Sequence, residues 1–291
     1  MTQLGSNKKP LYASLAAAVL SISSLPATAD DHSSHSKSLI KEQRALLAKN
    51  TDGMGFGPQS PRDIDAKAGA NKRLFGYAVP STQMNLCNIH FHKNAEHKGG
   101  EFTTYAGDGD GKGHKTGFKY SGSLSSSEST PANNNICAGK GDSLMVGDTI
   151  ELHYVYSSAS VTPGPSLGAC LAESTVNPGL RVEGQVFVLV NDDDALDFAD
   201  VTAVASQNGY HQAVNIPSNT GTPVEYLGST TGPAYNEKAS PLQVSWSVRP
   251  KVAKVDINSV GEWCESNIFN EDHAHGVRNL VVNEKLLSPI N

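Results

Sequence analysis

Short apolar runs of strand length, separated by turn-forming residues, dominate the chain from about residue 71 onward. Apolar and β-branched runs between clusters of Gly, Pro, Asn, Asp and Ser are typical of β-strands. The pattern therefore predicts a mainly β protein with short helices. The runs expected to form strands are 84–92, 148–156, 181–190, 242–248 and 280–287.

The chain before residue 71 has a different character. Residues 30–37 are polar and are expected to be mobile. Residues 37–49 carry leucine and isoleucine at helical spacing, which predicts a short surface helix. Residues 50–70 are rich in Gly, Pro and Asp, and we expect them to form a linker or a strap.

The first residues are typical of a secretory signal peptide. Lys8 and Lys9 precede an apolar stretch over residues 11–25, and Ala27-Thr28-Ala29 gives an A-x-A cleavage site. A transmembrane anchor is disfavoured, because the stretch contains four serines and is shorter than the roughly 20 residues that a span needs. We expect a periplasmic or secreted protein with no membrane partner after cleavage. The expected division is a signal peptide over 1–29, a polar segment and strap over 30–70, and the principal domain over 71–291.

Composition agrees with a β-rich fold and narrows the partners. The 291 residues are 38% hydrophobic, 18% charged and 7% aromatic, with 27 glycines and 15 prolines. Low charge with many turn formers argues against a helical bundle or coiled coil. The net charge of −6 becomes −8 after cleavage, with 21 basic and 29 acidic side chains, and no basic cluster is present. This balance argues against nucleic acid as a partner.

Two polar segments contain acidic residues without a clear site. Residues 106–141 are thick with Gly, Ser, Lys and Asn and are expected to be a surface insertion. Within them, Asp108-Gly109-Asp110-Gly111 is similar to a calcium loop, but Lys119 stands where an EF-hand requires Glu. Residues 191–200 form an acidic loop with no evident pairing of carboxylates. We interpret both segments as solvated loops.

The four cysteines predict two structural disulfides in an oxidising compartment. Cys87, Cys137, Cys170 and Cys264 contain no C-x-x-C pair, so a zinc knuckle is not supported. Four cysteines allow three pairings, among which the sequence does not choose. We prefer Cys87–Cys137 together with Cys170–Cys264.

The chemistry is carried by two short histidine patterns. Side chains two residues apart in a strand point to the same face, so His90 and His92 present two imidazoles together while Phe91 points the other way. By the same rule Glu151 and His153 share a face of a second predicted strand.

A third imidazole from the second strand would complete a metal site. Three histidines with one open position are the arrangement of catalytic zinc. Glu151 would then accept the free ring N–H of a ligand and fix its tautomer. A single H-x-H pair is more often two surface histidines, but the E-x-H pattern and the nearby Glu96-His97 favour the metal site.

The first histidine pattern resembles one motif of the cupins. His90-Phe91-His92 followed by Glu96 is similar to the H-x-H and Glu of that family, which would make Glu96 a fourth ligand to iron or manganese in an oxygenase or isomerase. The cupin glycines are replaced by Met84 and Thr103, and no P-x-G-x-x-H precedes the third histidine.

A more extensive resemblance is to the carbonic anhydrases of the alpha class and the related delta class. Residues 90–97 (HFHKNAEH) are similar to the H-F-H-x-x-x-E-H run of secreted bacterial alpha enzymes, and residues 151–155 (ELHYV) to their E-x-H-x-V. Residues 226–233 (YLGSTTGP) resemble the Y-x-G-S-L-T-T-P-P loop, and residues 244–246 (VSW) the V-T-W strand. The long insertion and the segment His273–Arg278 favour the delta branch.

This resemblance implies a large central twisted sheet, mostly antiparallel and of alpha-carbonic-anhydrase type, around a zinc enzyme. Zn²⁺ on His90, His92 and His153 would lower the pKa of a bound water to about 7, the value known for carbonic anhydrase, and the resulting hydroxide would attack CO₂ to give bicarbonate. Thr230 or Thr231, of which we take Thr230, would orient the hydroxide and donate to Glu96.

The resemblance also suggests surrounding roles. Val155, Val244 and Trp246 would form the apolar CO₂ wall, although they fit equally well as ordinary core residues. His97 is interpreted as a buried structural histidine. No histidine lies between His35 and His90 to relay protons, so a water chain or other histidines would serve. The candidates for the relay are His114, His211 and His275. A catalytically inactive, metal-binding carbonic-anhydrase-related module is the remaining alternative.

Overall fold

The computed structural model describes residues 31–53, 57–73, 75–132, 135–140, 142–230, 235–240 and 242–291. The predicted signal peptide lies outside these residues, as does the stretch 231–234, which includes Thr231 and the end of the predicted active-site loop.

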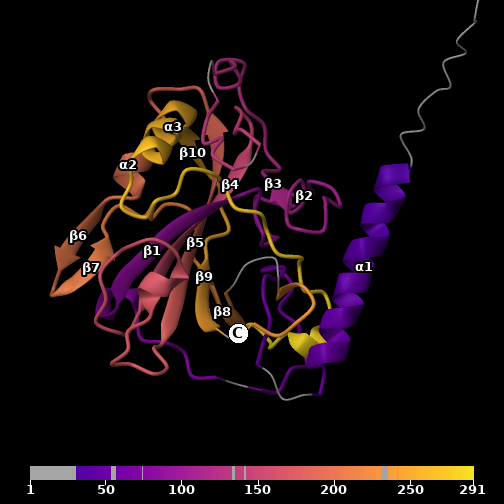
Figure 1. Ribbon diagram of the computed structural model, residues 1–291. Helices are drawn as coiled ribbons and strands as arrows, with labels where there is room; N and C mark the ends of the chain where they lie inside the picture. The colour runs from indigo at the N-terminus through magenta and orange to yellow at the C-terminus, as the bar shows by residue number, and fades with distance from the viewer. Residues whose placement is uncertain are drawn as a thin grey trace, which may run out of the picture.

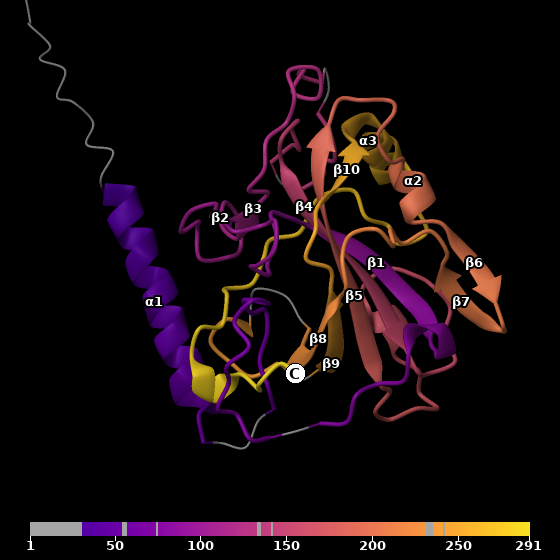
Figure 2. The same cartoon turned by 180° about the vertical axis from the view of Figure 1, so that it is seen from behind.

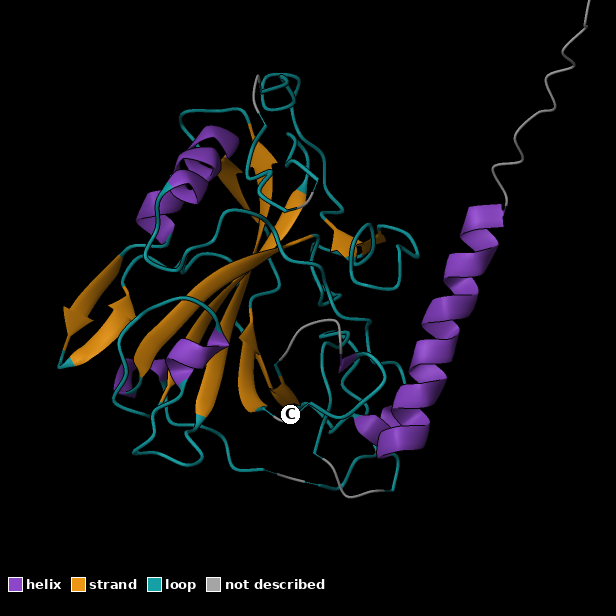
Figure 3. Ribbon diagram, in the orientation of Figure 1, coloured by secondary structure: helices purple, strands orange, loops and turns teal. Residues whose placement is uncertain are grey.

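Six strands of the described residues form a mixed central sheet (Figures 1 and 3). Antiparallel pairs join β1 to β4, β4 to β5 and β8 to β9, whereas β9 and β10 each run parallel to β5. The fold class is therefore as predicted: mainly β, with a large, mostly antiparallel sheet. The strands in sheet order are β1 (Asn85–Lys93), β4 (Thr149–Ser157), β5 (Leu180–Val190), β9 (Gln243–Val248) and β8 (Val224–Ser229), with β10 (Ala253–Asp256) on β5.

Short elements surround this sheet. Two helices, α2 (Phe198–Val201) and α3 (Ile257–Glu265), lie together near β10, while α1 (Asp31–Thr51) runs along the other side of the molecule (Figures 1 and 2). None of the helices in the described ranges has the length and hydropathy needed to span a bilayer. The remaining elements are hairpins β2 (Thr104–Tyr105) with β3 (Phe118–Lys119) and β6 (Val204–Gln207) with β7 (Tyr210–Ala213), and the 3₁₀ turns η1 (Ser81–Gln83), η2 (Leu167–Cys170) and η4 (Glu284–Leu286).

Alternation along the strands gives the sheet two different faces. One face packs against α2 and α3, where Phe187 of β5 meets Phe198 and where Phe198 meets Trp263. The Asp256 carboxylate caps α3 by accepting from the Ser259 N–H. The opposite face carries a second apolar cluster that includes Val155 and Trp246. The histidines lie on this second face.

Four of the five predicted strands are confirmed, and the fifth is wrong. The runs at 84–92, 148–156, 181–190 and 242–248 correspond to β1, β4, β5 and β9 within one residue at each end. The run 280–287 forms no strand and contains η4. Its apolar residues Val281, Leu286 and Leu287 are buried against Leu47 of α1, so the hydrophobic signal came from packing against a helix.

Two boundaries differ from expectation. The predicted helix over 37–49 is present, but α1 begins at Asp31 and so includes the stretch expected to be mobile. Residues 226–229, interpreted as part of a loop, are the second half of β8. Within the predicted insertion, Phe118, Ile136 and Cys137 are buried while most residues from 121 to 131 are exposed, so its two ends belong to the packed domain.

Both disulfides form, but our preferred pairing is wrong. The bonds are Cys87–Cys170 and Cys137–Cys264. Cys87 and Cys170 belong to the cluster on the histidine face, whereas Cys137 and Cys264 pack on the face of α2 and α3. The preferred pairs would each have had to cross the sheet.

Packing of the aromatic residues between β5 and α2 predicts a large stability effect. Phe187 has no exposed surface, so Phe187→Ala should lower the free energy of unfolding by about 3–5 kcal/mol through lost burial and the cavity left behind. The matched control is Val176→Ala, because Val176 is 91% exposed, and it should change stability by less than about 0.5 kcal/mol. Denaturant unfolding followed by circular dichroism measures both. Equal effects would contradict this description of the core.

Candidate metal centre

Adjacent strands bring the predicted histidines together. In the register of β1 and β4, His90 lies opposite His153 and His92 lies opposite Glu151. One ring nitrogen from each of His90, His92 and His153 lies within 4.8 Å of the others. The three histidines therefore share one face of the sheet, as the alternation predicted, and their geometry fits a metal ion.

Hydrogen bonds at the outer ring nitrogens determine which nitrogens point inward. His92 Nδ1 donates to the carbonyl of Gly276 at 2.9 Å, and His90 Nδ1 donates to Asn88 Oδ1 at 2.7 Å. The Asn88 amide is oriented by its own donation to the Gly164 carbonyl at 3.1 Å. His153 Nε2 donates to Glu151 Oε1 at 3.0 Å. These tautomers leave lone pairs on His90 Nε2, His92 Nε2 and His153 Nδ1.

Burial keeps the rings of His90 and His92 neutral. Burial, together with the neighbouring His153, lowers the pKa of His92 to about 3 and moves the pKa of His90 well below its ordinary value. His153 Nδ1 and His90 Nε2 lie 3.3 Å apart, each with a lone pair facing the other. Neutral imidazoles with converging lone pairs are the form that binds a cation.

Glu151 orients much of the centre although it has no exposed surface. Its Oε1 accepts from His153 and from His97 Nδ1, and its Oε2 accepts from the backbone N–H groups of Glu96 and His97 at 2.7 and 3.1 Å. Burial alone would raise the pKa of Glu151, but His97 and His153 hold it well below the usual value. The group is therefore a fully hydrogen-bonded carboxylate.

His97 is a buried histidine behind the pocket. Its Nδ1 donates to Glu151, so its Nε2 accepts from the Tyr226 hydroxyl at 2.7 Å. Burial raises the pKa of Tyr226 well above its ordinary value, so the phenol keeps the proton that it donates. The ring of Trp246 packs edge-on against His97 and His153, with centroids 4.7 and 5.0 Å away.

A buried ion pair holds Glu96. Arg278 Nη2 donates to Glu96 Oε1 at 2.9 Å, and the same guanidinium nitrogen donates to the Ser229 carbonyl at 3.1 Å. Burial works to raise the pKa of Glu96, but the charge and hydrogen bond of Arg278, together with His92 and His153, outweigh it and hold this pKa at about 2. Glu96 is therefore ionised and fixed beside the histidines.

The histidines open into a cavity of about 400 Å³. Thr230, Glu96 and His275 lie among its lining residues. Leu167 is the one large apolar side chain among the described residues that line it. The described lining consists of Asn88, His90, His92, Glu96, His153, Ser166, Leu167, Gly168, Thr230, Glu271, His275 and Gly276.

The other predicted site residues lie at varying distances from this cavity. Val155, Val244 and Trp246 are buried in the apolar cluster beneath the histidines and do not figure in the described lining. Among the described relay candidates, His275 lines the cavity, whereas His211 lies on β7 and His114 in the insertion. His275 Nε2 donates to Glu271 Oε2 at 2.6 Å.

Several site residues escaped the sequence analysis. Asn88 shares the face of His90 and His92 because it precedes them by two and four residues, so the same alternation rule could have identified it. Gly276 and Arg278 lie in the segment His273–Arg278, which the sequence analysis named for the resemblance without a role at the site, and Glu271 lies just before it, more than 170 residues after β1. No local pattern joins that segment to the histidines.

Comparison with known proteins now identifies the family. A sequence model of the delta carbonic anhydrase family matches residues 81–259, well over half of the chain. The chain belongs to the delta carbonic anhydrase family and is a carbonic anhydrase by that membership, which supports carbon dioxide hydration in general. No match to a curated protein was found.

Solved structures were compared as well. A hyperthermostable carbonic anhydrase from an active hydrothermal vent chimney aligns at 14% identity and a TM-score of 0.28, covering 77% of this chain and 85% of that one. The alpha-carbonic anhydrase of Thermovibrio ammonificans in complex with the inhibitor sulfanilamide aligns at 13% identity and a TM-score of 0.26, covering 77% and 84%. Scores this low add nothing to the argument.

Family membership excludes the cupin alternative. That interpretation also required Glu96 as a fourth ligand, whereas its carboxylate is paired with Arg278. Glu96, His97 and His153 also bring ligand atoms within 4.8 Å of one another, but both ring nitrogens of His97 are hydrogen-bonded, to Glu151 and to Tyr226.

Removal of Arg278 should expose the cost of the buried charge at Glu96. Arg278→Met should lower the free energy of unfolding by about 3–5 kcal/mol, because it leaves an unpaired buried carboxylate. The double variant Glu96→Gln/Arg278→Met removes both charges and should be more stable than the single Arg278→Met variant. Denaturant unfolding of metal-free protein measures this. If the loss of unfolding free energy in the double variant equalled the sum of the losses in the two single variants, the result would contradict the ion pair.

Proposed function

We propose that the chain binds Zn²⁺ through His90, His92 and His153 and catalyses the reversible hydration of carbon dioxide to bicarbonate and a proton. The observation that supports this most directly is the convergence of three imidazole lone pairs on one cavity, while an acceptor occupies each of the other ring nitrogens. Three neutral histidines with an open position are the ligand set of catalytic zinc.

The spacing of one pair of ligands fits a tetrahedral ion such as zinc. Zn–N bonds of about 2.0–2.1 Å in a tetrahedral site place two ligand nitrogens about 3.3–3.4 Å apart. His153 Nδ1 and His90 Nε2 are 3.3 Å apart. When bound, the metal supplies Lewis acidity that makes water nucleophilic near neutral pH.

The chain's own residues orient the reaction. Thr230 and Glu96 line the same cavity, and Glu96 is held ionised by Arg278. An ionised carboxylate accepts a hydrogen bond from a threonine hydroxyl, which leaves the hydroxyl oxygen to accept from the attacking water. Thr230 would in this way direct the lone pair of the nucleophile toward carbon dioxide, and Glu151 would keep His153 in its ligating tautomer.

Leu167 would provide the apolar surface against which carbon dioxide binds. An apolar molecule gains by contact with an apolar surface, and Leu167 presents one beside the histidines. Val155, Val244 and Trp246 would then support the site from beneath. This differs from the sequence expectation, in which those three residues formed the wall.

The two disulfides indicate the compartment in which the protein works. Two disulfides close within the described residues, and such bonds persist in oxidising environments. We propose that residues 1–29 act as a signal peptide and that the catalytic domain, residues 71–291, functions in the periplasm or outside the cell.

The His153→Ala variant tests the metal assignment. It removes one of three ligands, so purified protein should contain no stoichiometric zinc, and stopped-flow CO₂ hydration should fall to the background rate. Val176→Ala is the control and should keep both, because Val176 is 91% exposed and is not among the described residues that line the cavity. Chelation should abolish hydration by the wild type, an aromatic sulfonamide should inhibit it, and added Zn²⁺ should restore the activity of the chelated enzyme.

The metal content of the purified wild type decides the proposal. Iron in the protein without CO₂ hydration would overturn it, and zinc without hydration would indicate a catalytically inactive module.

Thr230→Ala tests the orienting role separately from metal binding. The variant should retain zinc but lose about 10²–10³-fold in kcat/KM, the range for loss of one preorganised hydrogen bond at the reacting centre. Thr220→Ala provides the control, since Thr220 is also buried but hydrogen-bonds to Gln185 outside the cavity. Full activity of Thr230→Ala would exclude this residue and direct attention to Thr231.

A further inference from the structure

Residues 271–278, here called the wall segment, connect the metal centre to one disulfide. We propose that the Cys137–Cys264 disulfide is a redox-sensitive latch that holds the wall segment in the position required for metal binding. Its effect on catalysis rests on the function proposed above, whereas its effect on the wall segment does not.

The wall segment contributes to the centre at several points. The Gly276 carbonyl accepts from His92 Nδ1, and Arg278 pairs with Glu96. His275 is joined to β1 through its backbone: its N–H donates to the Phe91 carbonyl at 2.8 Å, and its carbonyl accepts from the Lys93 N–H at 3.0 Å. A displacement of this segment therefore moves the group that orients a metal ligand.

The outer side of the wall segment is tied to the two cysteine-bearing elements. On the side of Cys137, Ala138 pairs with His273 in an antiparallel bridge, and the Gly139 N–H donates to the Asp272 carbonyl at 3.2 Å. The approach is close, because a Cβ on Gly139 would lie 2.5 Å from the Asp272 carboxyl carbon.

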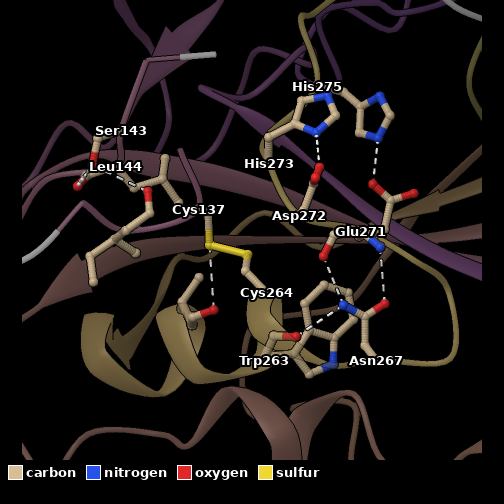
Figure 4. The surroundings of a disulfide bond; sticks show 12 residues. Cys137, Ser143, Leu144, Trp263, Cys264, Asn267, Glu271, Asp272, His273 and His275 are labelled. Carbon is tan, nitrogen blue, oxygen red and sulfur yellow. Dashed lines mark hydrogen bonds and ion pairs between the residues drawn. A yellow bond between two sulfur atoms is a disulfide. The ribbon is translucent and has the colours of Figure 1, made fainter. Parts of the chain in front are cut away.

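On the side of Cys264, an asparagine links the end of α3 to the wall segment (Figure 4). Asn267 Nδ2 donates to the carbonyls of Trp263 and Glu271 at 2.9 and 2.7 Å. Glu271 in turn accepts from His275 Nε2. The disulfide joins Cys137 to Cys264 and so links the two attachments of the wall segment to each other (Figure 4).

The two disulfides differ in access. Cys87 and Cys170 are 0% and 1% exposed, so a reductant does not reach them without unfolding. Cys137 and Cys264 line a surface hollow of about 590 Å³; Cys137 is 5% exposed, and access to the bond is from the side of Cys264, which is partly exposed. Thiol–disulfide exchange requires access to a sulfur. A mild dithiol should therefore reduce Cys137–Cys264 selectively.

The chemical step is a two-electron reduction. The S–S bond breaks, Cys137 and Cys264 become thiols, and the dithiol that supplies two electrons and two protons closes its own disulfide. Ile136 and Trp263 belong to the apolar core beside the two cysteines, and their packing continues to hold both elements after reduction. Reduction removes the covalent link between the two elements to which the wall segment is attached. The backbone hydrogen bonds of the wall segment should then open more often.

Three proteins test the latch: the wild type, Cys137→Ser/Cys264→Ser, and the matched control Cys87→Ser/Cys170→Ser. After a mild dithiol, thiol labelling with mass spectrometry should find Cys137 and Cys264 in the wild type. Amide hydrogen exchange of residues 271–278 in metal-free protein should become faster, and the zinc dissociation constant should rise by about 10–100-fold, the range for loss of a group that orients a metal ligand. The Cys87→Ser/Cys170→Ser control should show the same two changes after dithiol. Cys137→Ser/Cys264→Ser should show neither change on addition of dithiol, because its hydrogen exchange and zinc affinity should already match those of the reduced wild type.

The outcomes separate the latch from the proposed function. Unchanged exchange of residues 271–278 in wild type whose Cys137 and Cys264 are labelled would overturn the latch, as would labelling of Cys87 and Cys170 first. These two readouts need only the wild type, so they hold even where a serine variant does not fold. If the oxidised protein neither binds zinc nor hydrates CO₂, the proposed function fails, while hydrogen exchange still decides the latch.

Discussion

The buried carboxylate of Glu151 is the interaction on which the arrangement of this protein depends. A charge in the interior is tolerated only when its hydrogen-bonding capacity is satisfied, and Glu151 is satisfied by two imidazoles and two backbone N–H groups. Those four donors come from β4 and from the chain that follows β1. The carboxylate therefore joins the two strands beneath the site, selects the tautomer of His153 and brings Glu96 beside the histidines.

Around this carboxylate, preorganisation is distributed over distant parts of the chain. Asn88 and the Gly276 carbonyl orient the other two histidines, and Arg278 fixes Glu96. Each of these hydrogen bonds restricts the side chain that it holds to one orientation. The lone pairs of the ligating histidines therefore point into the cavity before a metal ion binds. The cost is the burial of several polar groups, which is offset because the described ones at the centre are paired with each other.

The disulfides stabilise opposite faces of the sheet and have different surroundings. Cys87–Cys170 is sealed in the core and ends η2, the turn that places Leu167 at the cavity. Cys137–Cys264 lines a surface hollow and closes the insertion onto the wall segment. The predicted pairing failed because cysteine spacing in the sequence carries no information about which face a residue occupies after a long connection.

Sequence patterns alone predicted the mainly β class, the positions of β1, β4, β5 and β9, and the pairs His90 with His92 and Glu151 with His153. All of these follow from alternation within one strand, where neighbouring residues decide the direction of each side chain. Three features became visible only in the folded chain: the disulfide pairing, the burial of residues 280–287 against α1, and the contact of Gly276 and Arg278 with the centre. Those contacts join residues far apart in the chain, and they depend on how the strands pair and on which loops cover the sheet. Local periodicity therefore does not predict how the strands pair or which loops cover the sheet.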